Sequence, residues 1–168
     1  MILVTGAHGR LGQAICVLLN ERRLAWKVGD ARKLAPQDFV GVHAVIDVAA
    51  GMTPGRMRYH AQLAADAGIT HYVMASSLLV TEYEQGRLRS HTRRHGGAVR
   101  KLEVERVLAE FGIPYQIVRL PPFYYGYGLH SRPVMILRSW YRRRSWHTPV
   151  SLNRAAQLLC GSLLRLSH

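Results

Sequence analysis

The stretch Thr5-Gly6-Ala7-His8-Gly9-Arg10-Leu11-Gly12 decides the fold of this chain of 168 residues. The apolar run Ile2-Leu3-Val4 directly before it is typical of a buried parallel strand. After it, apolar residues recur at intervals of three and four positions, which predicts an amphipathic helix. These residues are Leu11, Ala14, Ile15, Leu18 and Leu19. The three glycines therefore occupy a turn that joins a strand to a helix.

Each glycine of this turn has a physical role in binding phosphate. Gly6 permits the tight turn, Gly9 lets the backbone approach a pyrophosphate, and Gly12 lets the helix pack close to the strand. The N-terminus of the helix then presents unpaired N–H groups and its positive dipole end to the phosphates. The spacing is G-x-x-G-x-x-G, and it predicts a dinucleotide site for NAD(P). We expect the cofactor to contact Gly6, Ala7, His8, Gly9, Arg10, Leu11 and Gly12.

The rest of the chain alternates predicted strands with predicted helices. We expect strands at residues 24–28, 44–48, 71–75 and 115–120, helices at 54–67, 98–111 and after Ser151, and a loop at 84–97. This order predicts an α/β protein with a doubly wound, Rossmann-like parallel sheet. Residues 1–128 are expected to form the NAD(P)-binding Rossmann domain. Residues 129–168 are expected to be a short basic C-terminal extension whose helix packs on the same domain, with little or no separate substrate domain.

Four further motifs follow in order: Gly29-Asp30 with residues 41–50, then residues 67–77, 101–108 and 112–121. Together with the glycine turn they resemble the short-chain dehydrogenase/reductase superfamily, in its extended (NAD-dependent epimerase/dehydratase) and atypical (NmrA-like) branches. The resemblance covers roughly residues 1–128. It implies an oxidoreductase or epimerase-like protein acting on a small molecule.

The resemblance also implies roles for single residues. Ser77, or its neighbour Ser76, would be the active-site serine, and Lys101 would be the active-site lysine that also binds the nicotinamide ribose. The remaining cofactor contacts would come from Asp30, Ala31, Arg32, Ala49, Ala50 and Gly51.

The sequence departs from this family at the acid/base residue. Active members carry a tyrosine four residues before the lysine, but here that position is Gly97. Three interpretations are open. A group on the preceding loop (His95, His91 or Tyr83) replaces the tyrosine; or hydride transfer needs no tyrosine; or the protein binds its cofactor without turnover, as a sensor or scaffold module.

The adenosine side is shortened, because only about nine residues separate the first helix from Gly29-Asp30. Asp30 then has two interpretations. It binds the ribose and selects NAD, or it faces the adenine while Arg10, Arg32 or Lys33 faces a 2′-phosphate. The balance favours NADP slightly.

Charge is uneven along the chain. Residues 85–168 hold fifteen Lys and Arg against three Asp and Glu, and the whole chain has a net charge of +13. Several explanations are open. The basic half binds an acidic partner or a polyanion, or the Arg- and aromatic-rich residues 138–147 bind nucleic acid. Alternatively, the charges lie on a solvated face or at a homodimer interface. We expect a cytoplasmic protein with two reduced cysteines, no metal site and no membrane span.

Overall fold

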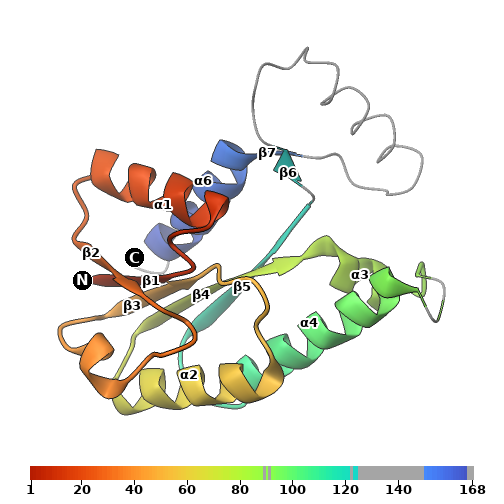
Figure 1. Cartoon of the computed structure of the whole chain (residues 1–168), viewed down its shortest axis with the longest axis horizontal. Helices are drawn as coiled ribbons and strands as arrows, with labels where there is room; N and C mark the ends of the chain where they lie inside the picture. Colours follow the sequence, from red (N-terminus) through yellow and green to blue (C-terminus); the bar gives the residue numbers. More distant parts are fainter. Residues whose placement is uncertain (89, 91, 122, 125–149, 166–168) are drawn as a thin grey trace.

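The computed structural model describes residues 1–88, 90, 92–121, 123–124 and 150–165. Five parallel strands form one sheet in the order β2-β1-β3-β4-β5 (Figure 1). The strands are β1 (Ile2–Thr5), β2 (Trp26–Gly29), β3 (Ala44–Asp47), β4 (His71–Ser77) and β5 (Tyr115–Leu120). This arrangement confirms the predicted α/β, Rossmann-like sheet. Two short strands, β6 (Phe123–Tyr124) and β7 (Val150–Ser151), form a separate parallel pair.

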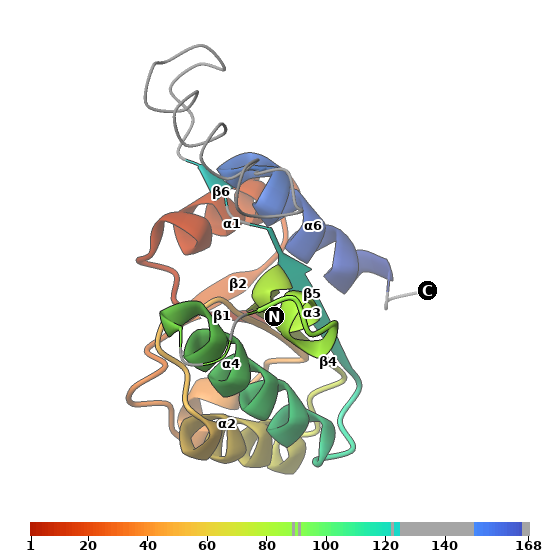
Figure 2. The same ribbon diagram turned by 90° about the vertical axis from the view of Figure 1, so that its right-hand side faces the viewer.

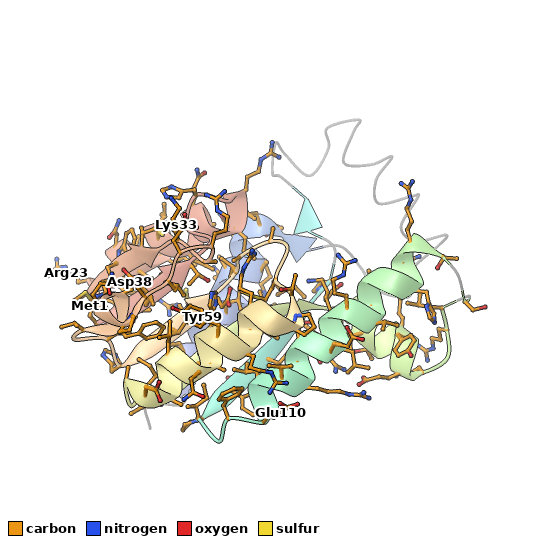
Figure 3. All side chains as sticks on the ribbon, turned by 60° about the horizontal axis from the view of Figure 1, so that its bottom comes forward. Met1, Arg23, Lys33, Asp38, Tyr59 and Glu110 are labelled. Atoms are coloured by element: carbon orange, nitrogen blue, oxygen red, sulfur yellow. The ribbon has the colours of Figure 1, made fainter. Side chains whose placement is uncertain are left out.

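Helices cover both faces of the sheet. Figures 1 and 2 show α1 (Arg10–Glu21) and α6 (Leu152–Arg165) on one face, with α2 (Pro54–Asp66) and α4 (Arg93–Ala109) on the other. A 3₁₀ turn, η1 (Pro36–Phe39), precedes β3, and α3 (Leu78–Glu84) follows β4. Arg58 of α2 forms a 3.0 Å ion pair with Glu110, which follows α4 and is labelled in Figure 3.

The alternation of side chains along each strand divides the core into two clusters. On β1, Ile2 and Val4 are buried in the cluster beneath α1 and α6, while Leu3 is buried in the cluster beneath α2 and α4. On β3, Ala44 and Ile46 belong to the first cluster and Val45 to the second. Thr5 and Asp47, which pair in register at the carboxyl ends of β1 and β3, therefore face α2 and α4.

The C-terminal helix belongs to the same unit as the glycine turn. Ser151 Oγ accepts a 3.2 Å hydrogen bond from the Arg154 amide at the start of α6. Ala155, Ala156 and Leu159 of α6 are buried in the same cluster as Ile15 of α1. Residues 129–149 of the expected C-terminal extension lie outside the described residues.

The loop expected at residues 84–97 is confirmed for the described residues between α3 and α4 and is wrong at residue 84 and at residues 93–97, which are helical. The structure has α3 immediately after β4, and α4 starts at Arg93, five residues before the expected start. Thr92 Oγ1 accepts a 3.1 Å hydrogen bond from the His95 amide and caps α4. The interpretation failed because Gly96 and Gly97, which have low helix propensity, lie inside the helix.

The sheet explains the short connection on the adenosine side. β2 pairs directly with β1, with Thr5 beside Gly29 in register, and β2 is the edge strand of the sheet that the described residues form. Asp30 is thus the first residue after the strand beside the glycine turn.

Candidate functional site

The glycine turn has the shape of a phosphate cradle. Gly6 has a φ of +72°, and a β-carbon there would lie 2.7 Å from the Ala49 nitrogen. A β-carbon on Gly12 would overlap the Gly6 carbonyl and lie 2.6 Å from the Ala7 α-carbon. The Gly9 amide donates to the Gly6 carbonyl at 2.9 Å and closes the turn. Only glycine fits at positions 6 and 12, so the predicted tight turn and close helix packing are both present.

The N-terminus of α1 is open to a ligand. Gly9 is its N-cap residue, and no side chain caps the helix. His8, Gly9 and Arg10 are exposed, whereas Ala7 and Gly12 are buried. Backbone N–H groups and the helix dipole therefore face solvent where a phosphate would lie, and the residues present fit a dinucleotide.

Asp47 is the centre of a buried polar cluster at the carboxyl end of β3. It accepts hydrogen bonds from Thr5 Oγ1 at 2.7 Å, from the Ala49 amide at 3.0 Å and from the Tyr72 hydroxyl at 3.0 Å. Nδ1 of His60 on α2 lies 3.8 Å from its second oxygen. Burial opposes ionisation, but His60, Thr5 and Ala49 outweigh it and hold the pKa of Asp47 below its ordinary value. The cluster fixes the loop that follows β3 against β1.

Tyr72 and His60 extend this cluster in two directions. Burial, together with the charge and hydrogen bond of Asp47, raises the pKa of Tyr72 well above its ordinary value. The hydroxyl therefore stays protonated and donates to the carboxylate. His60 Nε2 lies 2.9 Å from the Ala31 carbonyl oxygen, so α2 links the loop after β2 to the loop after β3.

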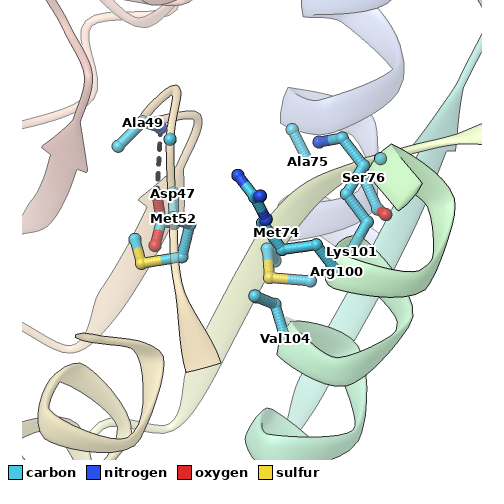
Figure 4. A pocket seen from close by; sticks show the side chains of 11 residues that line it. Asp47, Ala49, Met52, Met74, Ala75, Ser76, Arg100, Lys101 and Val104 are labelled. Atoms are coloured by element: carbon cyan, nitrogen blue, oxygen red, sulfur yellow. Dashed lines mark hydrogen bonds between the residues drawn. The ribbon is translucent and has the colours of Figure 1, made fainter. Parts of the chain in front are cut away.

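A pocket of about 230 Å³ lies between the loop after β3, the end of β4 and the first turns of α4 (Figure 4). Its lining residues are Asp47, Ala49, Gly51, Met52, Met74, Ala75, Ser76, Gly97, Arg100, Lys101 and Val104. The structure thus brings Lys101 together with Ala49 and Gly51, three of the residues predicted for the site. Ala50 is exposed beside the pocket and does not line it.

The two candidate serines have different surroundings. Ser77 Oγ accepts a 3.3 Å hydrogen bond from the Leu79 amide and caps α3, and Ser77 is not among the pocket residues. Ser76 lines the pocket, is buried, and donates a 2.5 Å hydrogen bond to Glu105. The structure therefore associates the pocket with Ser76, the second of the two serines considered from the sequence.

Glu105 joins Ser76 to the last strand of the sheet. It lies on α4, is buried, and accepts hydrogen bonds from Arg119 Nη2 at 2.5 Å and Nε at 3.1 Å. Arg119 also pairs with Glu84 of α3 at 2.6 Å. The hydrogen bonds that Arg119 donates to Glu105 and Glu84 raise its pKa further above its ordinary value. This network connects β4, β5, α3 and α4 behind the pocket.

Gly97 leaves open space where the family's tyrosine would stand. It lines the pocket, and a β-carbon added there would meet nothing within 4 Å. Of the substitutes considered, Tyr83 and His95 pack edge to face with ring centroids 5.0 Å apart, and neither lines the pocket. His91 lies outside the described residues. Neither Tyr83 nor His95 therefore fills the tyrosine's position.

Two cations line the pocket one after the other on α4. Burial lowers the pKa of Lys101, although the carboxylates of Glu105 and Asp47 oppose this. Arg100 is exposed and reaches across the pocket from α4 (Figure 4). Neither Arg100 nor Asp47 was singled out as a pocket residue from the sequence, although Asp47 ends an apolar strand where a buried polar residue is a signal.

The adenosine end holds a pair of opposite charges. Asp30 accepts hydrogen bonds from the Arg32 amide at 3.0 Å and from Arg32 Nε at 3.2 Å. These hydrogen bonds hold the pKa of Asp30 below its ordinary value. Both side chains are exposed, while Ala31 between them is buried.

Three further expectations from the sequence concern a metal site, a membrane span and residues 138–147. Among the described residues, no group of three or more His, Cys, Asp and Glu is arranged to hold a metal ion. In the same part of the chain, no helix has the length and apolar character needed to cross a membrane. The Arg- and aromatic-rich residues 138–147 lie outside it.

The sequence matches no family model and no curated protein. The fold, however, matches solved structures. A putative NAD-dependent epimerase/dehydratase from Bacillus halodurans has a TM-score of 0.70 at 15% identity, over 99% of this chain and 88% of that one. The enzyme WbmH from Bordetella bronchiseptica, solved with NAD+, has a TM-score of 0.66 at 17% identity, over 96% and 71% of the two chains.

A third match is dTDP-4-dehydrorhamnose reductase from Bacillus anthracis in complex with NADP, with a TM-score of 0.66 at 16% identity, over 97% and 70%. The first of these proteins is named as a putative epimerase/dehydratase and the third as a reductase. At such identities the likeness is one of fold. The chain is similar to these enzymes over nearly all of its length, and it has their Rossmann-type fold.

Proposed function

We propose that this chain binds NAD(P) at the carboxyl ends of β1, β2 and β3 and acts as an oxidoreductase or epimerase-like protein with a non-standard active site. The observation that carries the proposal is the glycine turn, where Gly6 and Gly12 admit no β-carbon and the N-terminus of α1 has no capping side chain. The fold likeness to solved proteins named for NAD or NADP supports it. When bound, the nicotinamide would supply or accept a hydride.

The chain's own residues would orient and protonate the substrate. Of the charged groups that line the pocket, Asp47 is held by three hydrogen-bond donors. Lys101 lines the pocket, and desolvation of its ammonium group lowers its pKa. We infer that Lys101 holds the mobile proton in place of the tyrosine, and that Ser76 rather than Ser77 faces the substrate side.

The first test is cofactor binding. NADH and NADPH are titrated against wild type and Gly9→Asp and followed by cofactor fluorescence. A carboxylate at position 9 would repel the phosphates, so binding should fall at least about 100-fold. Gly55→Asp is the matched control, because it adds the same charge near the N-terminus of α2, away from the turn. If neither cofactor binds wild type below millimolar concentration, the proposal is wrong.

We infer NADP as the preferred cofactor, on the charge around the adenosine end. Arg10, Arg32 and Lys33 are exposed there against a single carboxylate, Asp30. Arg32→Ala should weaken NADPH binding about tenfold and leave NADH binding nearly unchanged, because it removes a partner of the 2′-phosphate. Asp30→Ala is the opposite control and should weaken NADH more than NADPH. Tighter binding of NADH by wild type would reverse the inference.

A second candidate function is a cofactor-binding module without turnover, and the open space at Gly97 favours it. The two functions separate on a panel of carbonyl and quinone compounds incubated with reduced cofactor. Turnover by wild type that is lost in Lys101→Ala identifies an enzyme. Absence of turnover by wild type, with turnover appearing in Gly97→Tyr, identifies a binding module that lost its acid.

A further inference from the structure

Arg100 is a charged residue of the pocket lining for which the described part of the chain shows no ion pair. It lies on α4 directly before Lys101, and its side chain is exposed. Figure 4 shows it extending from α4 into the pocket, toward the side formed by Asp47, Ala49 and Met52. Among the ion pairs of the described residues, none includes Arg100. Two other arginines differ in this respect: Arg119 is paired with Glu105 and Glu84, and Arg94 with Glu82.

Asp47, the acid that lines the pocket, forms no ion pair with Arg100 or Lys101 among the described residues. Asp47 is 2% exposed, and its carboxylate already accepts from Thr5, Ala49 and Tyr72. Glu105 faces Ser76 and Arg119 behind the pocket wall and does not line it. The surface that the pocket presents to a ligand is therefore positive, with Arg100 and Lys101 as its charged groups.

We propose that Arg100 is the anion-recognition residue of this pocket and that the substrate carries a carboxylate or phosphate group next to its reacting carbonyl or hydroxyl. The planar guanidinium has five N–H donors in a fork that matches the oxygens of such groups. Lys101, one residue later, stands at the reacting end. That the bound anion is a substrate rests on the proposed function. The binding of an anion by Arg100 does not depend on it.

The test uses two matched pairs of small probes on the cofactor-free protein. One pair is 2-oxobutanoate and the neutral 2-butanone; the other is dihydroxyacetone phosphate and the neutral dihydroxyacetone. Binding is measured from the shift of the Arg100 Nε–Hε signal and of α4 amide signals in ¹⁵N-resolved NMR spectra. The Nε signal is assigned by its loss in Arg100→Ala.

We expect wild type to bind at least one charged probe about 10- to 100-fold more tightly than its neutral counterpart, as a hydrogen-bonded charge pair predicts. The preference should disappear in Arg100→Ala and survive in part in Arg100→Lys, which keeps the charge but loses the fork. Arg106→Ala is the matched control, since Arg106 is exposed in the last turn of α4 and should leave the preference unchanged. The two pairs show whether carboxylate or phosphate is preferred.

Three results would overturn the inference: equal affinity for the charged and neutral members of both pairs, the same preference in Arg100→Ala as in wild type, or no binding of any probe by wild type. Thermal unfolding of Arg100→Ala shows that the helix is intact, and alanine at an exposed helix position should not destabilise it. Titration of NADPH in parallel separates this inference from the proposed function. If the protein binds the anions through Arg100 but binds neither cofactor, the inference about Arg100 stands and the proposed function is wrong.

Discussion

Thr5 at the end of β1 donates a 2.7 Å hydrogen bond to Asp47 at the end of β3, and both side chains are fully buried. The bond joins the strand that enters the glycine turn to the strand that enters the pocket loop. Asp47 also accepts a hydrogen bond from the Ala49 amide, whose nitrogen lies against Gly6. The phosphate cradle and the pocket are therefore held together by one carboxylate.

Asp47→Asn should lower the stability of the folded protein and make that stability less sensitive to low pH. The pKa of Asp47 is depressed in the folded protein, so its contribution is present above the unfolded pKa and is lost as the pH falls through the folded one. Wild type should lose stability as the pH falls below about 4, and the variant should show a shallower loss, with roughly 1 to 3 kcal/mol less stability at neutral pH. Urea unfolding between pH 2 and 7 measures both effects. The control Asp66→Asn changes an exposed acid at the end of α2, and an equal change there would contradict the prediction.

Gly12→Ala should prevent normal packing of α1 on β1. The added β-carbon would overlap the Gly6 carbonyl and lie 2.6 Å from the Ala7 α-carbon, and backbone atoms cannot move aside cheaply. We expect a loss of roughly 3 kcal/mol or more and loss of cofactor binding. Gly55→Ala is the matched control. Nothing lies within 4 Å of a β-carbon there, so the variant should unfold at the same temperature as wild type or a higher one.

Glu105→Gln should weaken the link between α4 and β5. The side chain keeps its shape but loses the charge that holds Arg119, which is only 27% exposed. Removing this charge should lower the free energy of unfolding by roughly 1.5 to 3 kcal/mol. Glu103→Gln changes an exposed glutamate on the same helix and should cost less than about 0.5 kcal/mol. Chemical denaturation compares the two variants, and equal losses would show that the Glu105 network does not stabilise the fold.

The two free cysteines should react at different rates. Burial raises the pKa of Cys160 to about 11, and its side chain is 1% exposed. Burial also raises the pKa of Cys16, which is partly accessible. Because the thiolate is the reactive form, a disulfide reagent at pH 8 should modify Cys16 slowly and Cys160 only after unfolding. Mass spectrometry of Cys16→Ser and Cys160→Ser assigns each rate, and rapid labelling of Cys160 in the folded protein would contradict the buried position of α6.

The elements that local chemistry specifies could be predicted from the sequence. The glycine turn, the apolar β1 and the strand at residues 115–120 were identified because glycine conformation and apolar periodicity act over a few neighbouring residues. The same reasoning wrongly assigned residues 93–97 to a loop, although two glycines lie there inside α4. A cap at Thr92 and packing of Ala98 and Leu102 override their low propensity.

The sequence by itself determined a Rossmann-type turn for phosphate and the absence of the tyrosine at Gly97. Only the tertiary structure decided that Ser76 and not Ser77 lines the pocket, that Asp47 and Glu105 hold its walls, and that Arg100 reaches into it. Thr5 and Asp47 are 42 residues apart, and Ser76 and Glu105 are 29 apart. No local rule relates such positions. They meet because parallel strands, joined by right-handed crossovers, bring their carboxyl ends to one edge of the sheet.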